Sequence, residues 1–405
     1  MGVIDTQPGK TLYVIYWAGS LILVKLPFWS LKYALPSQRP RPTWTWKRAM
    51  IVKLIQEIFS CKVDLWEDEE RDLTATIPDS SLTDAKFVWV EGVDDELYCG
   101  EIRRLGQITG VRPAKIGGYW YLKKDSEWDS PKAKPGEKTV LFMHGGAFYR
   151  GTAHPSDITA NFPRGLLQRS QTLQRIFAIE YRLSASAPKP PANPFPAALL
   201  DTLAGYRYLV QDAGFAPENI IVAGDSAGGS LAVALTRHLI ENPIPSLPPP
   251  GRILSASGWF DLAMSRVGPD SSNVLNGPID IFGAEEPGTI FGEYQVTAYR
   301  GALDFEVVKT NRYISPSSLE CEPTKGRGLF EGFPETYVAV GGAERGLDES
   351  TALIERMRAD GVKVVEDVPP DAVHDFVVFT WHDPERVEVL GRMGRWIDAI
   401  QTREF

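Results

Sequence analysis

A serine with the spacing of a nucleophile lies in the stretch Gly224-Asp-Ser226-Ala-Gly228. The apolar run before it predicts a buried strand, and the small and aliphatic residues after it predict a helix. Glycines on either side of the serine allow a sharp strand-to-helix turn that exposes its hydroxyl. The pattern therefore predicts that Ser226 is a nucleophile. A phosphate-binding glycine loop would carry a lysine here, and this stretch has none.

A serine needs a base to take its proton, and the chain has five histidines. His374, in the segment PPDAVHDF, follows the last expected strand and precedes the final expected helix. We expect this loop at the same sheet edge as the serine turn, so His374 is the predicted general base. The remaining histidines lie near the glycine pair or in or near helices: His144, His154, His238 and His382.

A glycine pair ends the apolar strand in LFMHGGAFYRG. Attack by a serine places negative charge on the substrate carbonyl oxygen, which backbone N–H groups can stabilise where no side chain obstructs them. We expect Gly145 and Gly146 to supply two such donors, and Ala227, directly after the nucleophile, to supply a third. His144 is expected to hold this loop rather than to transfer a proton.

Alternating apolar runs and helical stretches predict the scaffold that positions these groups. From about residue 86, eight β-rich runs occur, and helices separate the later ones. This order favours an α/β fold with a mostly parallel sheet covered on both faces. Residues 86–261 and 313–405 are the predicted core. Residues 262–312 lack a strand pattern and are predicted to be an insertion that caps the sheet together with residues 37–85.

The N-terminal residues 1–36 are unusually apolar. Thr11–Leu31 would be roughly 31 Å long as a helix, about one hydrocarbon thickness. Three interpretations are open: a membrane anchor or surface-lying helix, an apolar cap helix over a substrate pocket, or an ordinary core helix. No small-residue cleavage site follows, so a removed signal peptide is not expected. We expect an intracellular protein, either cytoplasmic or associated with a membrane such as the endoplasmic reticulum.

Charge and cysteine content exclude other classes. The formal net charge is -9, and no block of lysine and arginine is interleaved with aromatic residues, which argues against a nucleic-acid partner. The three cysteines are widely spaced and odd in number, so neither a zinc site nor a disulfide framework is expected. The acidic run Glu67–Asp72 is expected to be a solvated loop.

Eight short motifs occur in the order found in the hormone-sensitive-lipase-like branch of the α/β-hydrolases: HGGAF, EYRLSASAP, FPAALLD, GDSAGG, SGWFDL, YISPSSL, GGAE and VHDF. Residues 86–402 resemble that branch. The resemblance implies an eight-stranded sheet beneath a helical cap, and hydrolysis of carboxylic esters with no cofactor and no metal. The N-terminal portion is similar to fungal members, some of which act in secondary metabolism.

Two departures from the family pattern concern the site. Ala147 stands where the family has a third glycine, but its N–H remains, so the oxyanion site should persist. The segment GGAERGLDES has glycine where leucine is usual, which leaves two candidate acids. Glu344 follows directly from a strand and is favoured as the partner of His374. Asp348 is expected in the first turn of the next helix.

The sequence thus predicts a serine esterase that acts through an acyl-enzyme on a small to medium, fairly apolar ester. Asp375 is too close to the histidine in the chain to be the expected remote acid. One alternative is a biosynthetic acyltransferase or a condensation or cyclisation enzyme, if the cap excludes water. Another is a non-catalytic ligand receptor on the same fold. Nothing in the sequence indicates the oligomeric state. The aromatic residues that motivate the apolar substrate are Trp17, Phe28, Trp29, Trp44 and Trp46.

Overall fold

The computed structural model describes most of the chain. The acidic run Glu67–Asp72 falls outside the described part. The described residues are 7–61, 75–126, 128–283, 290–323 and 328–399.

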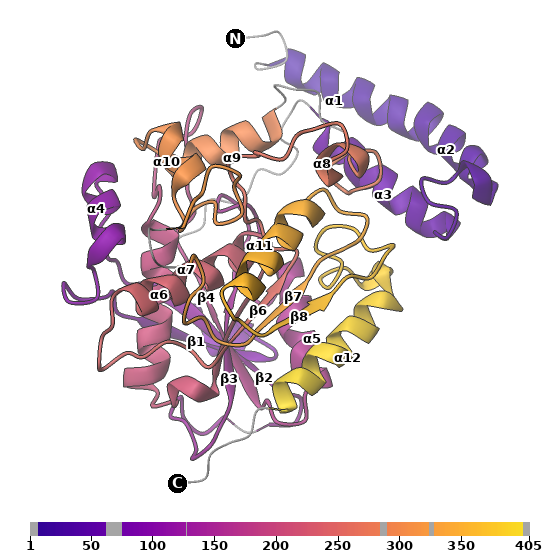
Figure 1. The fold of residues 1–405 in the computed structure, drawn as a ribbon. Helices are drawn as coiled ribbons and strands as arrows, with labels where there is room; N and C mark the ends of the chain where they lie inside the picture. The colour runs from indigo at the N-terminus through magenta and orange to yellow at the C-terminus, as the bar shows by residue number, and fades with distance from the viewer. Residues whose placement is uncertain (1–6, 62–74, 127, 284–289, 324–327, 400–405) are drawn as a thin grey trace.

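An eight-stranded sheet forms the centre of the molecule (Figure 1). The strand order is β1-β2-β4-β3-β5-β6-β7-β8. Strand β2 is antiparallel to both of its neighbours, and the strands from β4 through β8 run parallel to one another. This confirms the predicted mostly parallel sheet. The strands are β1 Ala85–Val90, β2 Ile116–Leu122, β3 Thr139–Met143, β4 Arg175–Ile179, β5 Ile220–Asp225, β6 Arg252–Ala256, β7 Thr336–Ala339 and β8 Val364–Asp367.

Helices cover both faces of this sheet. Strands β3, β4 and β5 are buried at every residue, which explains their continuous apolar sequence. One hydrophobic core lies between the sheet and α4, α6, α7 and α11. A second lies between the opposite face and α5 and α12. These helices are α4 Gly100–Thr109, α5 Asn161–Arg169, α6 Ala197–Arg207, α7 Ala227–Glu241, α11 Leu347–Ala359 and α12 Glu385–Asp398.

The N-terminal helices form a separate layer, which we call the N-terminal layer. Helices α1 and α2, joined by a π-helical turn, lie in one long rod beside α3 at one end of the molecule (Figure 1). A third hydrophobic cluster joins this layer to Ala343 and Val373, which immediately precede Glu344 and His374. The layer therefore backs the two loops that carry the predicted acid and base. Its elements are α1 Gly9–Ser20, η1 Leu21–Lys25, α2 Leu26–Ala34 and α3 Trp46–Phe59.

Side-chain hydrogen bonds fasten this layer to the core. Arg41 donates to the backbone oxygens of Pro370 at 2.9 Å and Gly342 at 3.0 Å. Arg48 makes a two-pronged ion pair with Glu385 at the start of α12, with N–O distances of 2.7 and 2.6 Å. The layer is thus held by specific contacts as well as by apolar packing.

The segment between β6 and β7 carries three helices. Helices α9 and α10 lie at the same end of the molecule as the N-terminal layer, and α8 lies beside that layer (Figure 1). Tyr299 of α9 stacks on Phe148, with ring centroids 3.9 Å apart. The bounds are α8 Ser272–Leu275, α9 Ile290–Arg300 and α10 Phe305–Thr310. A π-helical turn, Tyr208–Asp212, follows α6, and short 3₁₀ helices are Pro36–Gln38, Asp79–Ser81, Ile158–Ala160, Pro217–Asn219 and Thr380–His382.

Candidate active site

Ser226 occupies a sharp turn between β5 and α7. Its backbone lies at φ 48° and ψ -117°, a conformation rarely adopted by residues other than glycine. A Cβ atom on Gly228 would lie 1.9 Å from the backbone oxygen of Met143, and one on Gly224 would lie 2.4 Å from the backbone of Gly228. Only glycine fits at both positions, so the flanking glycines let the turn close against β3 and hold the serine at the strand end.

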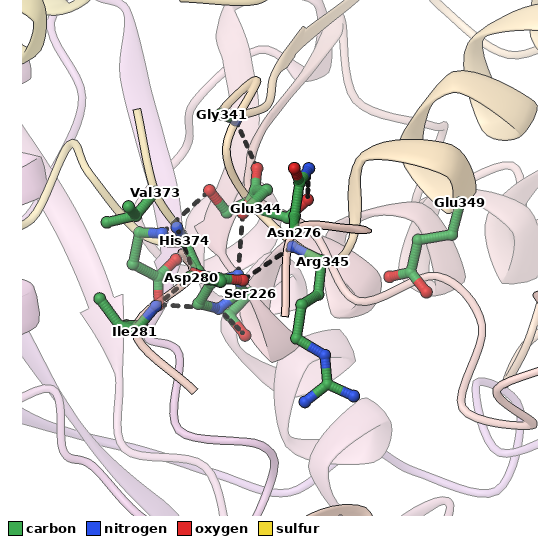
Figure 2. Close-up of polar contacts among 12 residues, drawn as sticks. Ser226, Asn276, Asp280, Ile281, Gly341, Glu344, Arg345, Glu349, Val373 and His374 are labelled. Carbon is green, nitrogen blue, oxygen red and sulfur yellow. Dashed lines mark hydrogen bonds and ion pairs between the residues drawn. The ribbon is translucent and has the colours of Figure 1, made fainter. Parts of the chain in front are cut away.

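The structure brings Ser226, His374 and Glu344 into one hydrogen-bonded chain (Figure 2). The His374 Nε2 atom lies 3.0 Å from the Ser226 Oγ, and its Nδ1 atom lies 2.9 Å from the Glu344 Oε2. The second oxygen of Glu344 accepts the backbone N–H of Gly341. Glu344 is fully buried, so these two contacts fix the carboxylate behind the imidazole.

Asp348, the alternative acid, lies elsewhere. It is in the first turn of α11, as the sequence indicated, and its carboxylate accepts the backbone N–H of Ser272 at 2.8 Å. The Ser272 hydroxyl in turn accepts the N–H of Asp348 at 2.9 Å. The reciprocal pair joins α11 to α8, so it is Glu344 that reaches His374.

Asp280 is a buried residue at this site that no sequence motif indicated. Its Oδ1 accepts the backbone N–H of His374 at 3.1 Å, and its Oδ2 accepts that of Arg345 at 2.7 Å (Figure 2). Gln56 of α3 donates to the backbone oxygen of Asp280 at 2.7 Å. Asp280 therefore connects the loops that carry the acid and the base to the segment above the sheet and to the N-terminal layer.

The glycine loop turns sharply beside Ser226. Gly146 has φ 111° and Ala147 has φ 50°, which turn the chain so that Ala147 lines the cavity beside Ser226. A Cβ on Gly145 would lie 2.4 Å from a carboxylate oxygen of Asp225, so Gly145 lies close against that side chain. In the described chain, the backbone N–H groups of Gly146, Ala147 and Ala227 donate to no protein acceptor.

The histidine of this loop has a packing role. His144 is fully buried, and its ring stacks on Tyr181 with centroids 4.2 Å apart. The Tyr181 hydroxyl donates to the backbone oxygen of His144 at 2.7 Å. These contacts hold the loop, as the sequence led us to expect.

A cavity of about 120 Å³ opens beside Ser226. Phe282 packs on the His374 ring with centroids 4.8 Å apart and forms part of the cavity wall. Over the residues that the structure describes, no group of three or more histidine, cysteine or acidic side chains could hold a metal ion. Apolar and aromatic lining residues are Ala147, Trp259, Met264 and Phe282, and charged ones are Asp261, Arg266, Asp280, Arg345, Asp348, Glu349 and His374.

Buried carboxylates dominate the electrostatics. Burial by itself lowers the pKa of His374, but Asp375 and Glu344 outweigh it and raise that pKa well above its usual value. Burial raises the pKa of Glu344 and of Asp280, against the opposing effect of the adjacent histidine. Burial, reinforced by Asp261, raises the pKa of Glu349 to about 8. The site therefore holds several acids whose charge depends on the imidazole.

Comparisons with known proteins agree with this geometry. A sequence model of the α/β hydrolase fold matches residues 140–378, more than half of the chain. The chain is similar to the esterase LipU of Mycobacterium tuberculosis, with 29% identity over 262 residues, covering 64% of this chain and 77% of that protein. An acetyl-hydrolase of Streptomyces hygroscopicus is 34% identical over 143 residues, which cover 34% of this chain and only 41% of that protein.

Solved structures give the same picture. A hormone-sensitive lipase from a metagenome library superposes with a TM-score of 0.54 at 27% identity, covering 70% of this chain and 82% of the other. An esterase from the bacterial hormone-sensitive lipase family has a TM-score of 0.59 at 23% identity, covering 88% and 98% of the two chains. The second likeness concerns the fold alone.

Proposed function

This chain belongs to the α/β-hydrolase fold family, in its hormone-sensitive-lipase-like branch, and from that premise we propose that it hydrolyses carboxylic esters with Ser226 as nucleophile. The observation that carries the proposal is the hydrogen-bonded chain Ser226–His374–Glu344 opening into a cavity. The names of its relatives as esterases and lipases favour hydrolysis over acyl transfer, cyclisation or a receptor without catalysis.

The geometry supports a two-step reaction. The neutral His374 takes the Ser226 proton at Nε2 as Oγ attacks the ester carbonyl carbon. The imidazolium then gives this proton to the leaving alcohol oxygen, and the acyl group stays on the serine. Water then attacks the acyl-enzyme carbonyl as His374 takes a proton from it, and the imidazolium returns that proton to the Ser226 Oγ as the carbon–Oγ bond breaks and the carboxylic acid leaves. Glu344 fixes the imidazole tautomer and stabilises its cation in both steps.

We assign the oxyanion site to the backbone N–H groups of Gly146, Ala147 and Ala227. Each is free of a protein acceptor within the described chain, and Ala147 borders the cavity at Ser226. Donors that are already oriented stabilise the developing negative charge without reorganisation. The positive φ values at Gly146 and Ala147 support this orientation.

The cavity supports a substrate with a short apolar acyl group. Its volume is about 120 Å³. Trp259, Met264 and Phe282 offer apolar contacts to such a group. Purified protein tested on p-nitrophenyl esters from acetate to decanoate should show the highest kcat/KM at two to four carbons. Ser226→Ala, whose side chain lacks the hydroxyl, is the control. Activity that survives in this variant, or none in the wild type, contradicts the proposal.

We also propose that the N-terminal layer binds the surface of a membrane. The helix Gly9–Ala34 is long and apolar enough to span a bilayer. One side of it, including Trp29 and Tyr33, packs with α3 in the third hydrophobic cluster. The other side is exposed, with 77% of Leu23 and 78% of Leu31 accessible. A helix docked on one side and apolar on the other suits a position in the membrane interface. Exposed apolar residues of this rod are Leu12, Ile15, Tyr16, Ile22, Leu23, Val24, Phe28 and Leu31.

Vesicle flotation tests this second proposal. The full chain should float with phosphatidylcholine vesicles, and the double variant Leu23→Glu/Leu31→Glu should remain in the dense fraction because charges would enter the interface. A double variant at exposed residues outside the layer, Ile108→Glu/Val267→Glu, is the control and should float like the wild type. Equal flotation of all three proteins contradicts membrane binding by this face.

A further inference from the structure

We propose that Asp375 is a second carboxylate partner of the His374 imidazole, on the side that faces Ser226. Its negative charge holds the imidazole in the protonated form and thereby restricts turnover to alkaline solution. This inference rests on the ester hydrolysis proposed above. It concerns the residue that follows the histidine in the chain, which the spacing argument had set aside as an acid.

The carboxylate lies against the nitrogen that must accept the serine proton. The His374 Nε2 atom is 3.0 Å from the Ser226 Oγ and 3.2 Å from the Asp375 Oδ2. The opposite nitrogen, Nδ1, is 2.9 Å from Glu344. A neutral imidazole has one N–H, and Glu344 engages it. An Nε2 lone pair would then face the Asp375 oxygen, whereas the imidazolium offers an N–H to both carboxylates.

Asp375 is held in this position by its own backbone. Its φ of 54° turns the side chain back toward the histidine, and its N–H donates to the Ser257 hydroxyl at 3.0 Å. Within the described chain, His374 is the cationic group that pairs with it. Its Oδ1 is buried and accepts no hydrogen bond there. The carboxylate is thus fixed in place with the imidazole as its counter-charge.

Other groups around the imidazole are acidic too. Glu344 faces Nδ1, Asp280 accepts the His374 backbone N–H, and Glu349 acts on it from α11. Asp225, behind the glycine loop, is fully buried, and burial together with Asp375 raises its pKa well above the usual value. Arg345, which also lines the cavity, directs its guanidinium away from the histidine (Figure 2). Asp375 is distinguished from these groups by its contact with Nε2.

The protonation state of the imidazole determines the pH at which attack can occur. Attack requires the Nε2 lone pair, so an imidazolium must first release a proton to solvent. Asp375 raises the pKa of His374 and so moves this release to higher pH. Once attack begins, the serine proton resides on Nε2, and Asp375 stabilises that cation. Loss of the carboxylate should therefore ease activation at low pH and weaken the step at high pH.

The first test measures the imidazole without relying on turnover. Full-length protein labelled at histidine Cε1 gives up to five signals, and His374→Ala identifies the relevant one. Asp375→Asn should lower the pKa of His374 by about one to three units, the usual effect of one opposite charge at this distance. Asparagine tolerates the positive φ at this position, so the backbone should be retained. An unchanged titration would overturn the proposal even if esterase activity is present.

The second test is kinetic. The acid limb of kcat/KM for p-nitrophenyl acetate should move to lower pH in Asp375→Asn, and the plateau at high pH should fall below that of the wild type, so that the two profiles cross. Asp371→Asn is the matched control, because that carboxylate pairs with Arg41 instead. A uniform loss at every pH would indicate a merely structural role and contradict the inference. An inactive wild type would refute the esterase proposal while the titration still decides the role of Asp375.

Discussion

Helices α7 and α1 are both apolar, yet their surroundings are opposite. Every residue of α7 from Ala227 to Leu239 is buried, whereas α1 has no buried residue. Helix α7 lies on the sheet and begins at the serine turn. Helix α1 belongs to the N-terminal layer and leaves its apolar side open. Apolar composition alone thus did not decide between burial and exposure, and it is the sheet that buries α7.

The two regions meet behind the catalytic loops. The core supplies Ser226 at the end of β5, and the N-terminal layer packs on the residues that precede Glu344 and His374. The core thus builds the nucleophile turn alone. The loops that carry the acid and the base pack against the core on one side and against the N-terminal layer on the other. Substitutions in the two regions should therefore affect stability and activity differently.

The largest effect is expected at the acid. Glu344→Gln keeps the shape but loses the charge that orients His374, so kcat should fall by about 10⁴ with little change in melting temperature. Asp348→Asn is the control, since its carboxylate contacts Ser272, and it should cost roughly 0.3–1 kcal/mol of stability with little change in kcat. The reverse pattern would transfer the role to Asp348. Stopped-flow or steady-state ester kinetics and thermal unfolding measure both quantities.

A matched pair of leucines sharpens the comparison directly. Leu231 of α7 is fully buried and Leu23 in the rod is 77% exposed. Leu231→Ala should lower the free energy of unfolding by about 2–5 kcal/mol. Leu23→Ala should change it by less than about 0.5 kcal/mol. Urea unfolding followed by circular dichroism measures both. An equal loss in both variants would mean that the rod packs on protein in solution.

Gln56 tests the link between the two regions. Its side-chain amide donates to the backbone oxygens of Pro278 at 3.1 Å and Asp280 at 2.7 Å. Gln56→Ala leaves these acceptors unsatisfied, which should cost about 1–3 kcal/mol of stability and lower kcat more than it raises KM. The exposed Gln211 makes one contact of 3.5 Å to Ser246, and Gln211→Ala should have neither effect. A kcat in Gln56→Ala equal to that of the wild type would show that this contact of the N-terminal layer does not affect catalysis.

The last prediction concerns the pH dependence of stability. The pKa of Glu349 is raised by burial to about 8, above its value in the unfolded chain. The folded state therefore binds a proton that the unfolded state has released, and stability should fall as the pH rises from about 4.5 to 8. Glu349→Gln should reduce this fall, and the exposed Glu306→Gln should not. Melting temperatures at pH 5.5 and 8.5 measure this fall. An equal fall in the wild type, Glu349→Gln and Glu306→Gln would contradict a protonated Glu349.

The sequence predicted the features that depend on local patterns. All eight expected strands are present. An apolar run bounded by turns forms a buried strand when helices cover it, so the local sequence pattern is enough to predict it. Ser226, His374 and Glu344 each directly follow a strand or lie in the loop after one, so parallel strands bring them to one edge. Placement at that edge followed from chain position, and the hydrogen-bonded contacts agree with it.

Other features depend on contacts between distant segments and could not be read from spacing. Asp280 reaches His374 from a segment with no strand pattern. The conformation of the glycine loop depends on the positive φ at Gly146 and Ala147. Asp375 was set aside as the acid because it neighbours the histidine in the chain. Its own positive φ nevertheless brings its carboxylate to the His374 Nε2 atom.

Intact-mass spectrometry after treatment with a fluorophosphonate tests the central claim most directly. The wild-type chain should gain the mass of one phosphonyl group and lose its esterase activity in parallel, because an activated Ser226 attacks the phosphorus. Peptide mapping should place the added mass on Ser226, and Ser226→Ala should remain unmodified under the same conditions. An unmodified wild-type chain, or equal labelling of Ser226→Ala, would contradict the account.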